Sequence, residues 1–122
     1  MAIKWVSNKI DASATIYESN ITLNTASSFH FKDTKDALIG YDDETNNIII
    51  KPLSIEESSE VEKDAIHQIV LKSTYGRING TKLIKNLCQF VPLDFKVKSF
   101  HKFPCTWDEE KKMLLINLST EI

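Results

Sequence analysis

The chain has 122 residues, of which 42% are hydrophobic and 26% are charged, and its formal net charge is −2. This length suffices for one compact domain and is too short for two large ones. No apolar run approaches the ~20 residues that cross a bilayer, and the N-terminal segment MAIKWVSNKIDAS lacks the apolar core of a secretory signal. We therefore expect a cytoplasmic protein without a membrane span.

The charges are distributed unevenly along the chain. Residues 1–61 carry a net charge of −5, whereas residues 62–122 carry +3. The basic excess is concentrated in residues 72–102, which hold seven basic residues and one acidic residue. Such a stretch is a candidate surface for a polyanion, and a simply solvated basic face is the alternative that the sequence leaves open.

The first half of the chain predicts strands around one short helix. Apolar and β-branched residues indicate a strand over 15–23, and the small polar residues that follow indicate a short helix over 25–31. Two β-rich runs, 37–41 and 47–52, flank the polar DDETN and predict a hairpin whose second strand ends at or near its proline. The acidic segment 54–64 predicts an exposed connector or a surface helix.

The second half predicts a similar series. Residues 65–71 indicate a strand, and Tyr75-Gly76-Arg77 indicates a turn. Apolar residues at helical spacing predict an amphipathic helix over 80–90. Within 95–98, aromatic and aliphatic residues alternate with lysines, which predicts a strand with a basic outer face. A final hairpin is expected over 107–118.

The two halves also share a repeated pattern. Residues 41–50 (YDDETNNIII) and 107–116 (WDEEKKMLLI) lie 66 positions apart, and each has an aromatic residue, three acidic residues and an aliphatic run. Upstream, Leu23-Asn24-Thr25 resembles Ile78-Asn79-Gly80 at a spacing of 55, so the second copy carries 11 extra residues before its hairpin. This pattern predicts a duplicated supersecondary unit.

We therefore expect one domain, 1–122, built of two repeats. The first copy covers about 14–53, the acidic connector covers 54–64, and the second copy covers about 65–119. Two small interlocking halves fit the length of the chain.

No residue pattern predicts catalysis. The chain has only three glycines, too few for a glycine-rich phosphate loop, and its three histidines are far apart. The acidic triplets at 42–44 and 108–110 lack the alternating pattern of a calcium loop and are interpreted as solvated turns. Cys88, His101 and Cys105 lack a fourth metal ligand. A single possible disulfide in a chain with an adequate core is not a disulfide framework, so both thiols are expected to be reduced. The prediction is a non-enzymatic protein with no cofactor and no metal site.

The segments ITLNTASSFHF and ALIGYDDETNNIIIKPL carry a resemblance to a known superfamily. Their succession of an I-T-[IL] strand, a short helix, and a hairpin that ends in an aliphatic run, a basic residue and Pro resembles the SpoVT-AbrB/MraZ superfamily of swapped-hairpin β-barrels. The second copy, YGRINGTKLIKNL and CTWDEEKKMLLINL, matches this pattern more loosely. The resemblance implies a mainly β fold with short helices (α+β), in which two tandem β-α-β-hairpin units close one pseudo-two-fold barrel. It also allows assembly into a homo-oligomer.

The resemblance further implies a DNA-binding, AbrB-like transcriptional regulator whose basic face meets duplex DNA. Residues 24–31 of the first copy contain no Lys or Arg, so we expect the contact to be lopsided and to use the basic face of residues 72–102. In such a contact Arg77 would reach base edges or phosphates, and the lysines would position the duplex. The predicted nucleic-acid-binding residues are Arg77, Lys82, Lys85, Lys72, Lys96 and Lys98.

A second hypothesis keeps the same fold and changes its role. The chain would then be a non-enzymatic protein-interaction module, antitoxin-like or an assembly subunit, whose acidic first half binds a basic protein partner. Salt-dependent affinity for duplex DNA separates the two hypotheses, because phosphate contacts release counterions.

Overall fold

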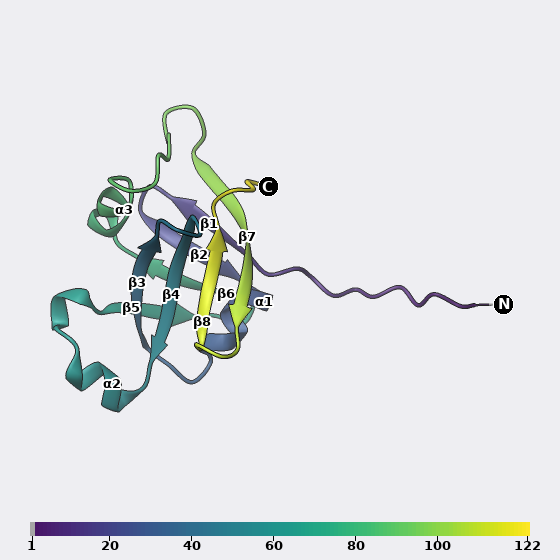
Figure 1. Ribbon diagram of the computed structural model, residues 1–122, viewed down its shortest axis with the longest axis horizontal. Helices are drawn as coiled ribbons and strands as arrows, with labels where there is room; N and C mark the ends of the chain where they lie inside the picture. The colour runs from purple at the N-terminus through teal and green to yellow at the C-terminus, as the bar shows by residue number, and fades with distance from the viewer. Residues whose placement is uncertain (1) are drawn as a thin grey trace.

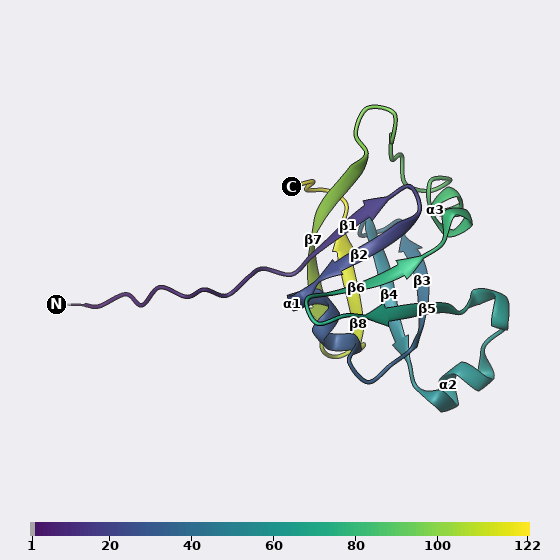
Figure 2. The same ribbon diagram turned by 180° about the vertical axis from the view of Figure 1, so that it is seen from behind.

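The computed structural model describes residues 2–122, which form a closed barrel of eight strands (Figures 1 and 2). The strands are β1 (Ser13–Tyr17), β2 (Asn20–Asn24), β3 (Asp36–Asp42), β4 (Asn47–Leu53), β5 (His67–Leu71), β6 (Tyr75–Asn79), β7 (Phe100–Asp108) and β8 (Met113–Asn117). Around the barrel they follow the order β1-β2-β6-β5-β3-β4-β8-β7, and every neighbouring pair is antiparallel. The expected mainly β fold with short helices is confirmed.

Short helices connect the hairpins. They are α1 (Thr25–Ser28) with the 3₁₀ turn η1 (Phe29–Phe31), α2 (Ile55–Glu60) with the 3₁₀ turn η2 (Lys63–Ala65), and α3 (Thr81–Leu87). Figure 1 shows α1 and α3 at opposite ends of the barrel and α2 outside it. No helix within residues 2–122 has the length and apolar character that a membrane crossing requires.

The helix α2 occupies the acidic segment 54–64 for a local reason. The Ser54 hydroxyl accepts the Glu57 N–H at 3.1 Å, and the Glu57 carboxylate accepts the Ser54 N–H at 3.0 Å. This capping box satisfies two backbone donors that a helix start otherwise leaves unpaired. The prediction of a surface helix in the connector is confirmed.

The strand order has an internal two-fold character. If β1, β2, β3 and β4 are exchanged with β5, β6, β7 and β8, respectively, every pair of neighbouring strands in the barrel is still a pair of neighbours. As a result, the hairpins β1–β2 and β3–β4 are never neighbours; strands β6 and β5 separate them on one side, and β8 and β7 on the other. The register agrees, because Thr22 pairs with Arg77 at the 55-residue spacing and Ile49 pairs with Leu115 at the 66-residue spacing.

The tips of the hairpins β3–β4 and β7–β8 have the same geometry. At each tip an Asp carboxylate accepts a backbone N–H two residues further on at 3.0 Å, and one non-glycine residue adopts the left-handed conformation. The matched pairs are Asp42 with Asp108, Glu44 with Glu110, and Asn46 (φ 57°) with Lys112 (φ 55°). Both acidic triplets therefore belong to Asx-type turns, which agrees with their interpretation as turns.

Inward-facing aliphatic side chains fill the barrel. On the adjacent strands β4 and β8 alternate residues point inward, and Ile48, Ile50, Leu114 and Ile116 are fully buried. Phe31 of η1 and Ile84 of α3 extend the same buried cluster. The period-two alternation on the strands and the helical spacing within 80–90 thus place apolar side chains in a single core.

Two local predictions are wrong at turns. The strand expected over 15–23 is the hairpin β1–β2, which reverses at Glu18-Ser19. Its turn contains no glycine or proline, and polar turn residues interrupt the apolar pattern only briefly. Conversely, Tyr75-Gly76-Arg77 is not a turn but the start of β6, and the reversal comes just before it, at 72–74.

The basic strand expected over 95–98 is also absent, because this segment lies in the irregular loop between α3 and β7. Tertiary packing decides its conformation. The Phe95 ring packs edge-on against His101, with ring centroids 5.4 Å apart, while Val97 remains 79% exposed. In addition, α3 ends at Leu87, three residues before the end of the predicted helix.

Gly76 offers a test of close packing within the barrel. A Cβ at this position would lie 2.9 Å from Leu71 Cδ2 and 3.0 Å from Ser28 Cβ, whereas a Cβ at Gly40 would meet nothing within 4 Å. We expect Gly76→Ala to lower the free energy of unfolding by about 1–3 kcal/mol through overpacking. Gly40→Ala should leave it unchanged or raise it by about 0.4–1 kcal/mol. Urea denaturation of both variants measures the difference, and equal effects would contradict the close α1–β6 contact.

Candidate nucleic-acid interface

The paired strands β2 and β6 lie between β1 and β5 at the centre of one side of the barrel, which faces the viewer in Figure 2. Burial alternates along both strands, so that Ile21, Leu23 and Ile78 point inward. The outward side chains of β1, β2 and β6 are here called the ribbon face. They are Thr15, Tyr17, Asn20, Thr22, Asn24, Tyr75, Arg77 and Asn79. All eight have hydrogen-bonding groups, and none is acidic.

One row of paired residues crosses the middle of this face. It runs from Lys102 on β7 through Thr15 and Thr22 to Arg77 and ends at Val70 on β5. A single register thus places two cationic side chains on one straight row. The row spans the Thr22–Arg77 pair, where the two halves of the barrel meet.

Arg77 lies in this row and contacts the neighbouring Tyr75 ring. Its guanidinium carbon lies 5.0 Å from the centroid of the Tyr75 ring, which supports the side chain by a cation–π contact. Among the described residues 2–122, its buried Nε has no hydrogen-bond partner and no carboxylate forms an ion pair with it. Buried donors are normally paired, so an unpaired Nε is unusual.

The six predicted residues do not form one patch. Lys82 and Lys85 are exposed on α3, at one end of β6. Lys72 lies at the other end, in the turn before β6, which the Thr25 hydroxyl fixes to α1 by donating to the Thr74 carbonyl at 2.8 Å. Arg77 lies between these two ends, and the remaining two residues lie in the loop between α3 and β7.

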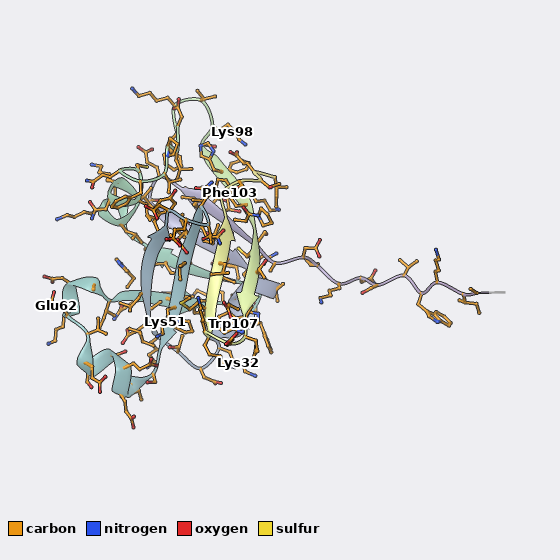
Figure 3. All side chains as sticks on the ribbon, viewed as in Figure 1. Lys32, Lys51, Glu62, Lys98, Phe103 and Trp107 are labelled. Atoms are coloured by element: carbon orange, nitrogen blue, oxygen red, sulfur yellow. The ribbon has the colours of Figure 1, made fainter. Side chains whose placement is uncertain are left out.

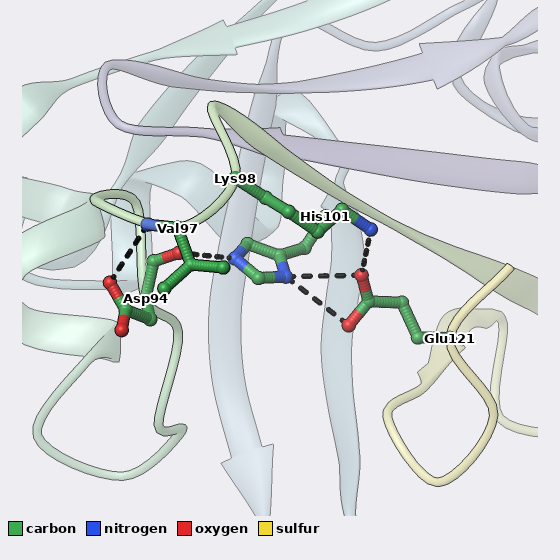
Figure 4. Close-up of polar contacts among 5 residues, drawn as sticks. All are labelled: Asp94, Val97, Lys98, His101 and Glu121. Carbon is green, nitrogen blue, oxygen red and sulfur yellow. Dashed lines mark hydrogen bonds and ion pairs between the residues drawn. The ribbon is translucent and has the colours of Figure 1, made fainter.

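That loop uses one of its lysines internally. The Lys98 ammonium lies 2.5 Å from the Glu121 carboxylate, so it is partly neutralised (Figure 4). Lys96 has no such partner among residues 2–122, and only its backbone N–H is bound, by the Asp94 carboxylate at 2.9 Å. Lys98 is therefore a structural residue in this arrangement, and Lys96 remains a free cation.

His101 organises the same end of the barrel. The residue is only 8% exposed, and its ring lies with Nδ1 3.1 Å from the Glu121 carboxylate and Nε2 3.0 Å from the Asp94 carbonyl. Figure 4 shows the ring between these two groups. Both neighbours are hydrogen-bond acceptors. The contacts tie the loop and the C-terminal residues to β7.

The Glu121 cluster gives a pH-dependent test. Hydrogen bonds from Lys98 and His101 hold the pKa of Glu121 below its usual value. A lowered pKa in the folded state stabilises the protein above the unfolded pKa of about 4.3, and this contribution is lost as pH falls through the folded value. We expect Glu121→Gln to cost about 0.2–1 kcal/mol at pH 7, because the partly exposed pair is screened by solvent.

The measurement is chemical denaturation of wild type and Glu121→Gln across the acid range. The difference between them should shrink as pH falls below the folded pKa of Glu121. Glu110→Gln is the control, because Glu110 forms no ion pair within residues 2–122. A difference that stays constant at all pH values would show that the charge of Glu121 contributes nothing.

The opposite end of the barrel carries an aromatic cluster, near the labelled Lys32 and Trp107 in Figure 3. His30 stacks on Trp107 with ring centroids 4.3 Å apart and planes within 3°, and burial lowers the pKa of His30. The Trp107 indole N–H donates to Glu109 at 2.9 Å. These contacts brace η1 against β7 and leave little room for a ligand between the two rings.

The cysteines and acidic groups show no metal-binding arrangement. Cys88 and Cys105 carry free thiols, and burial raises the pKa of Cys105 to about 11. Within residues 2–122, no group of three or more His, Cys, Asp or Glu side chains is placed to hold a metal ion.

Sequence reasoning proposed Arg77 as a candidate but missed the surface around it. Thr15, Tyr17 and Thr22 were assigned to one strand, so their approach to Arg77 could not be anticipated. The available signal was the run of polar residues from Glu18 to Asn20, which marks the reversal. Recognising that turn would have placed β2 beside β6 through the repeat spacing.

No protein-family model matches the chain, and searches of curated proteins and of solved structures also find no match.

Proposed function

We propose that this protein binds duplex DNA through the ribbon face, with Arg77 at the centre of the contact. One observation carries the proposal: the outward side chains of the adjacent antiparallel barrel strands β2 and β6 all have hydrogen-bonding groups, and none of them is a carboxylate. Some DNA-binding proteins read a groove with the strands of a β-sheet, whose outward side chains contact the bases.

Arg77 has the chemistry for the central contact. Its planar guanidinium presents several donors in a fork that matches guanine O6 and N7, or a phosphate. The Tyr75 ring limits its freedom before binding, so less conformational entropy is lost in the complex. Asn79 and Asn20, which pair across the ribbon, supply the amide groups that suit adenine.

Cations around the ribbon face suit phosphates. Lys102 ends the central row, Lys82 and Lys85 flank one end of β6, and Lys72 flanks the other. In contrast, the acidic triplets and α2 belong to the β3–β4 and β7–β8 hairpins and the connector between β4 and β5. A surface of this polarity orients the molecule so that the ribbon face approaches a polyanion.

The fold proposal accompanies the functional one. We propose that the barrel consists of two β-α-β-hairpin units with exchanged hairpins, as in the SpoVT-AbrB/MraZ superfamily, and that the protein regulates transcription as an AbrB-like factor. The invariance of the strand order and the matched hairpin tips support this assignment. A fold alone does not determine function, so the regulatory role rests on the ribbon face.

One specific observation supports the protein-interaction hypothesis. The connector 54–64 has five acidic residues and one lysine, and three of the acidic residues lie on the capped helix α2, which has no buried residue. A basic protein partner would find complementary charge there. This surface is separate from the ribbon face, so the two roles predict different sensitive residues.

The DNA proposal is tested by fluorescence anisotropy with a labelled duplex at salt concentrations between about 50 and 200 mM. We expect salt-dependent binding by the wild type and a loss of affinity of about tenfold or more in Arg77→Ala, as for other arginine contacts to bases or phosphates. Arg77→Lys should fall between the two, because it keeps the charge but loses the planar fork.

Lys63→Ala is the matched control, because it removes one positive charge from the exposed connector and leaves the ribbon face intact. Its affinity should stay close to that of the wild type. Equal losses in Lys63→Ala and Arg77→Ala would indicate non-specific charge attraction. If the wild type binds no duplex at low salt, the protein-interaction hypothesis replaces the DNA proposal.

A further inference from the structure

The barrel is incompletely paired at one seam. The strands β1 and β7 pair over five residues, from Ser13 with Pro104 to Tyr17 with Phe100. The corresponding strands β5 and β3 pair over only two, Asp36 with Gln68 and Ala37 with His67. Before His67 the chain turns away through η2, so residues 38–42 of β3 have a neighbour on only one side among the described residues.

The open side of β3 presents unpaired backbone groups. The Ile69 N–H donates to the Lys35 carbonyl at 2.9 Å. The backbone N–H and C=O groups of odd-numbered residues in this segment therefore point toward β5. Alternation along the strand then directs the N–H and C=O groups of Ile39 and Tyr41 toward the gap. An exposed strand edge of this kind is a template for pairing with another extended segment.

An apolar hollow lies along this edge. Ile39, Tyr41, Leu83, Leu87 and Phe90 supply its apolar and aromatic lining, and Asp64, His67 and Asn86 supply polar groups. Its volume is about 220 Å³, below the roughly 300 Å³ at which pockets for drug-sized ligands begin. Phe90, which stacks on Tyr41 at 6.0 Å between ring centroids, is nevertheless 62% exposed. The hollow suits one or two large side chains of a peptide strand.

The chain itself contains an extended segment with suitable side chains. Residues 2–10 precede β1 and make no strand pairing, and their large apolar side chains are exposed. Ile3 is 66%, Trp5 88%, Val6 96% and Ile10 67% exposed. In an extended strand Ile3 and Trp5 share one face, because side chains alternate. Isolated exposed apolar residues are common, but four within eight positions form a concentrated patch.

We propose that the N-terminal segment 2–10 of one copy adds as a strand to the open edge of β3 in a second copy, with Ile3 and Trp5 in the hollow beside α3. Strand addition would supply partners for the backbone groups of Ile39 and Tyr41. It would also cover the exposed rings of Phe90 and Trp5, a burial that contributes about 25 cal/mol per Å² of apolar surface.

The occupant is a second copy because of the direction in which the segment leaves the barrel. The Cys105 N–H donates to the Ala12 carbonyl at 3.0 Å, which fixes the base of the segment beside β7. Figures 1 and 2 both show the segment pointing away from the side of the barrel that holds β3 and α3. It would have to reverse around the barrel to reach its own hollow, whereas a neighbouring molecule meets it directly.

The charges also match. Residues 2–10 contain Lys4 and Lys9 and no acidic residue. The hollow is bordered by Asp64, and the tip that follows Tyr41 carries Asp42 and two more carboxylates. Opposite charges at the rim of an interface direct approach and disfavour the reverse orientation of the strand.

The test measures molar mass as a function of protein concentration by sedimentation equilibrium, using the full chain. We expect the wild type to exceed the monomer mass as concentration rises. Trp5→Ala and Phe90→Ala should each shift this rise to concentrations at least about tenfold higher, since a buried aromatic anchor dominates a small interface. Val97→Ala, an exposed apolar residue outside both surfaces, should behave like the wild type. Both key side chains are largely exposed in the single barrel, so the variants should fold normally.

A synthetic peptide of residues 2–10 should compete with the association and return the protein toward the monomer mass. A wild type that stays monomeric at all concentrations overturns the proposal, and so does a monomer whose Trp5 fluorescence is protected from quenchers, because the segment would then occupy its own barrel. Association that Trp5→Ala leaves unchanged overturns it as well. None of these outcomes depends on DNA binding.

Discussion

Barrel closure is the constraint on which the rest of the structure depends. Each hairpin has one apolar face and two open edges, and four pairings between strands from different halves of the chain, β2–β6, β4–β8, β1–β7 and the short β3–β5, cover most of those edges. The same pairings bring Ile48, Ile50, Leu114 and Ile116 into one buried cluster. A half of the chain folded alone would leave both its edges and its aliphatic face in water, so the halves stabilise each other.

The sequence anticipated the parts of the fold that local chemistry determines. The hairpins around 42–46 and 108–112 were predicted because polar turn residues separate aliphatic runs, and both tips form Asx-type turns. The Ser54 and Glu57 capping box likewise explains why an acidic connector contains a helix. In these cases neighbouring residues supply the hydrogen bonds that define the conformation.

Features that depend on distant residues were harder to predict. The alternation at 95–98 resembles that of a strand, but Phe95 packs against His101 and the segment stays irregular. Arg77 was recognised as a candidate, yet its setting required knowing that Thr22 pairs with it. Basic residues close in sequence also separated in space, since Lys72 and Lys82 lie at opposite ends of β6. Charge patterns along a chain therefore locate candidates better than they define a surface.

The two-fold character of the strand order has a further consequence, because both halves lie in one polypeptide. In a barrel made from two identical chains, folding and subunit association are linked by mass action, and dilution weakens the structure. Here the covalent connection through 54–64 makes barrel closure independent of concentration. In a dimer of identical chains, every substitution would also appear in both subunits. In this chain the paired positions Thr22 and Arg77 differ, so each half can carry its own substitutions. The barrel therefore has two chemically different halves, which a symmetric dimer lacks.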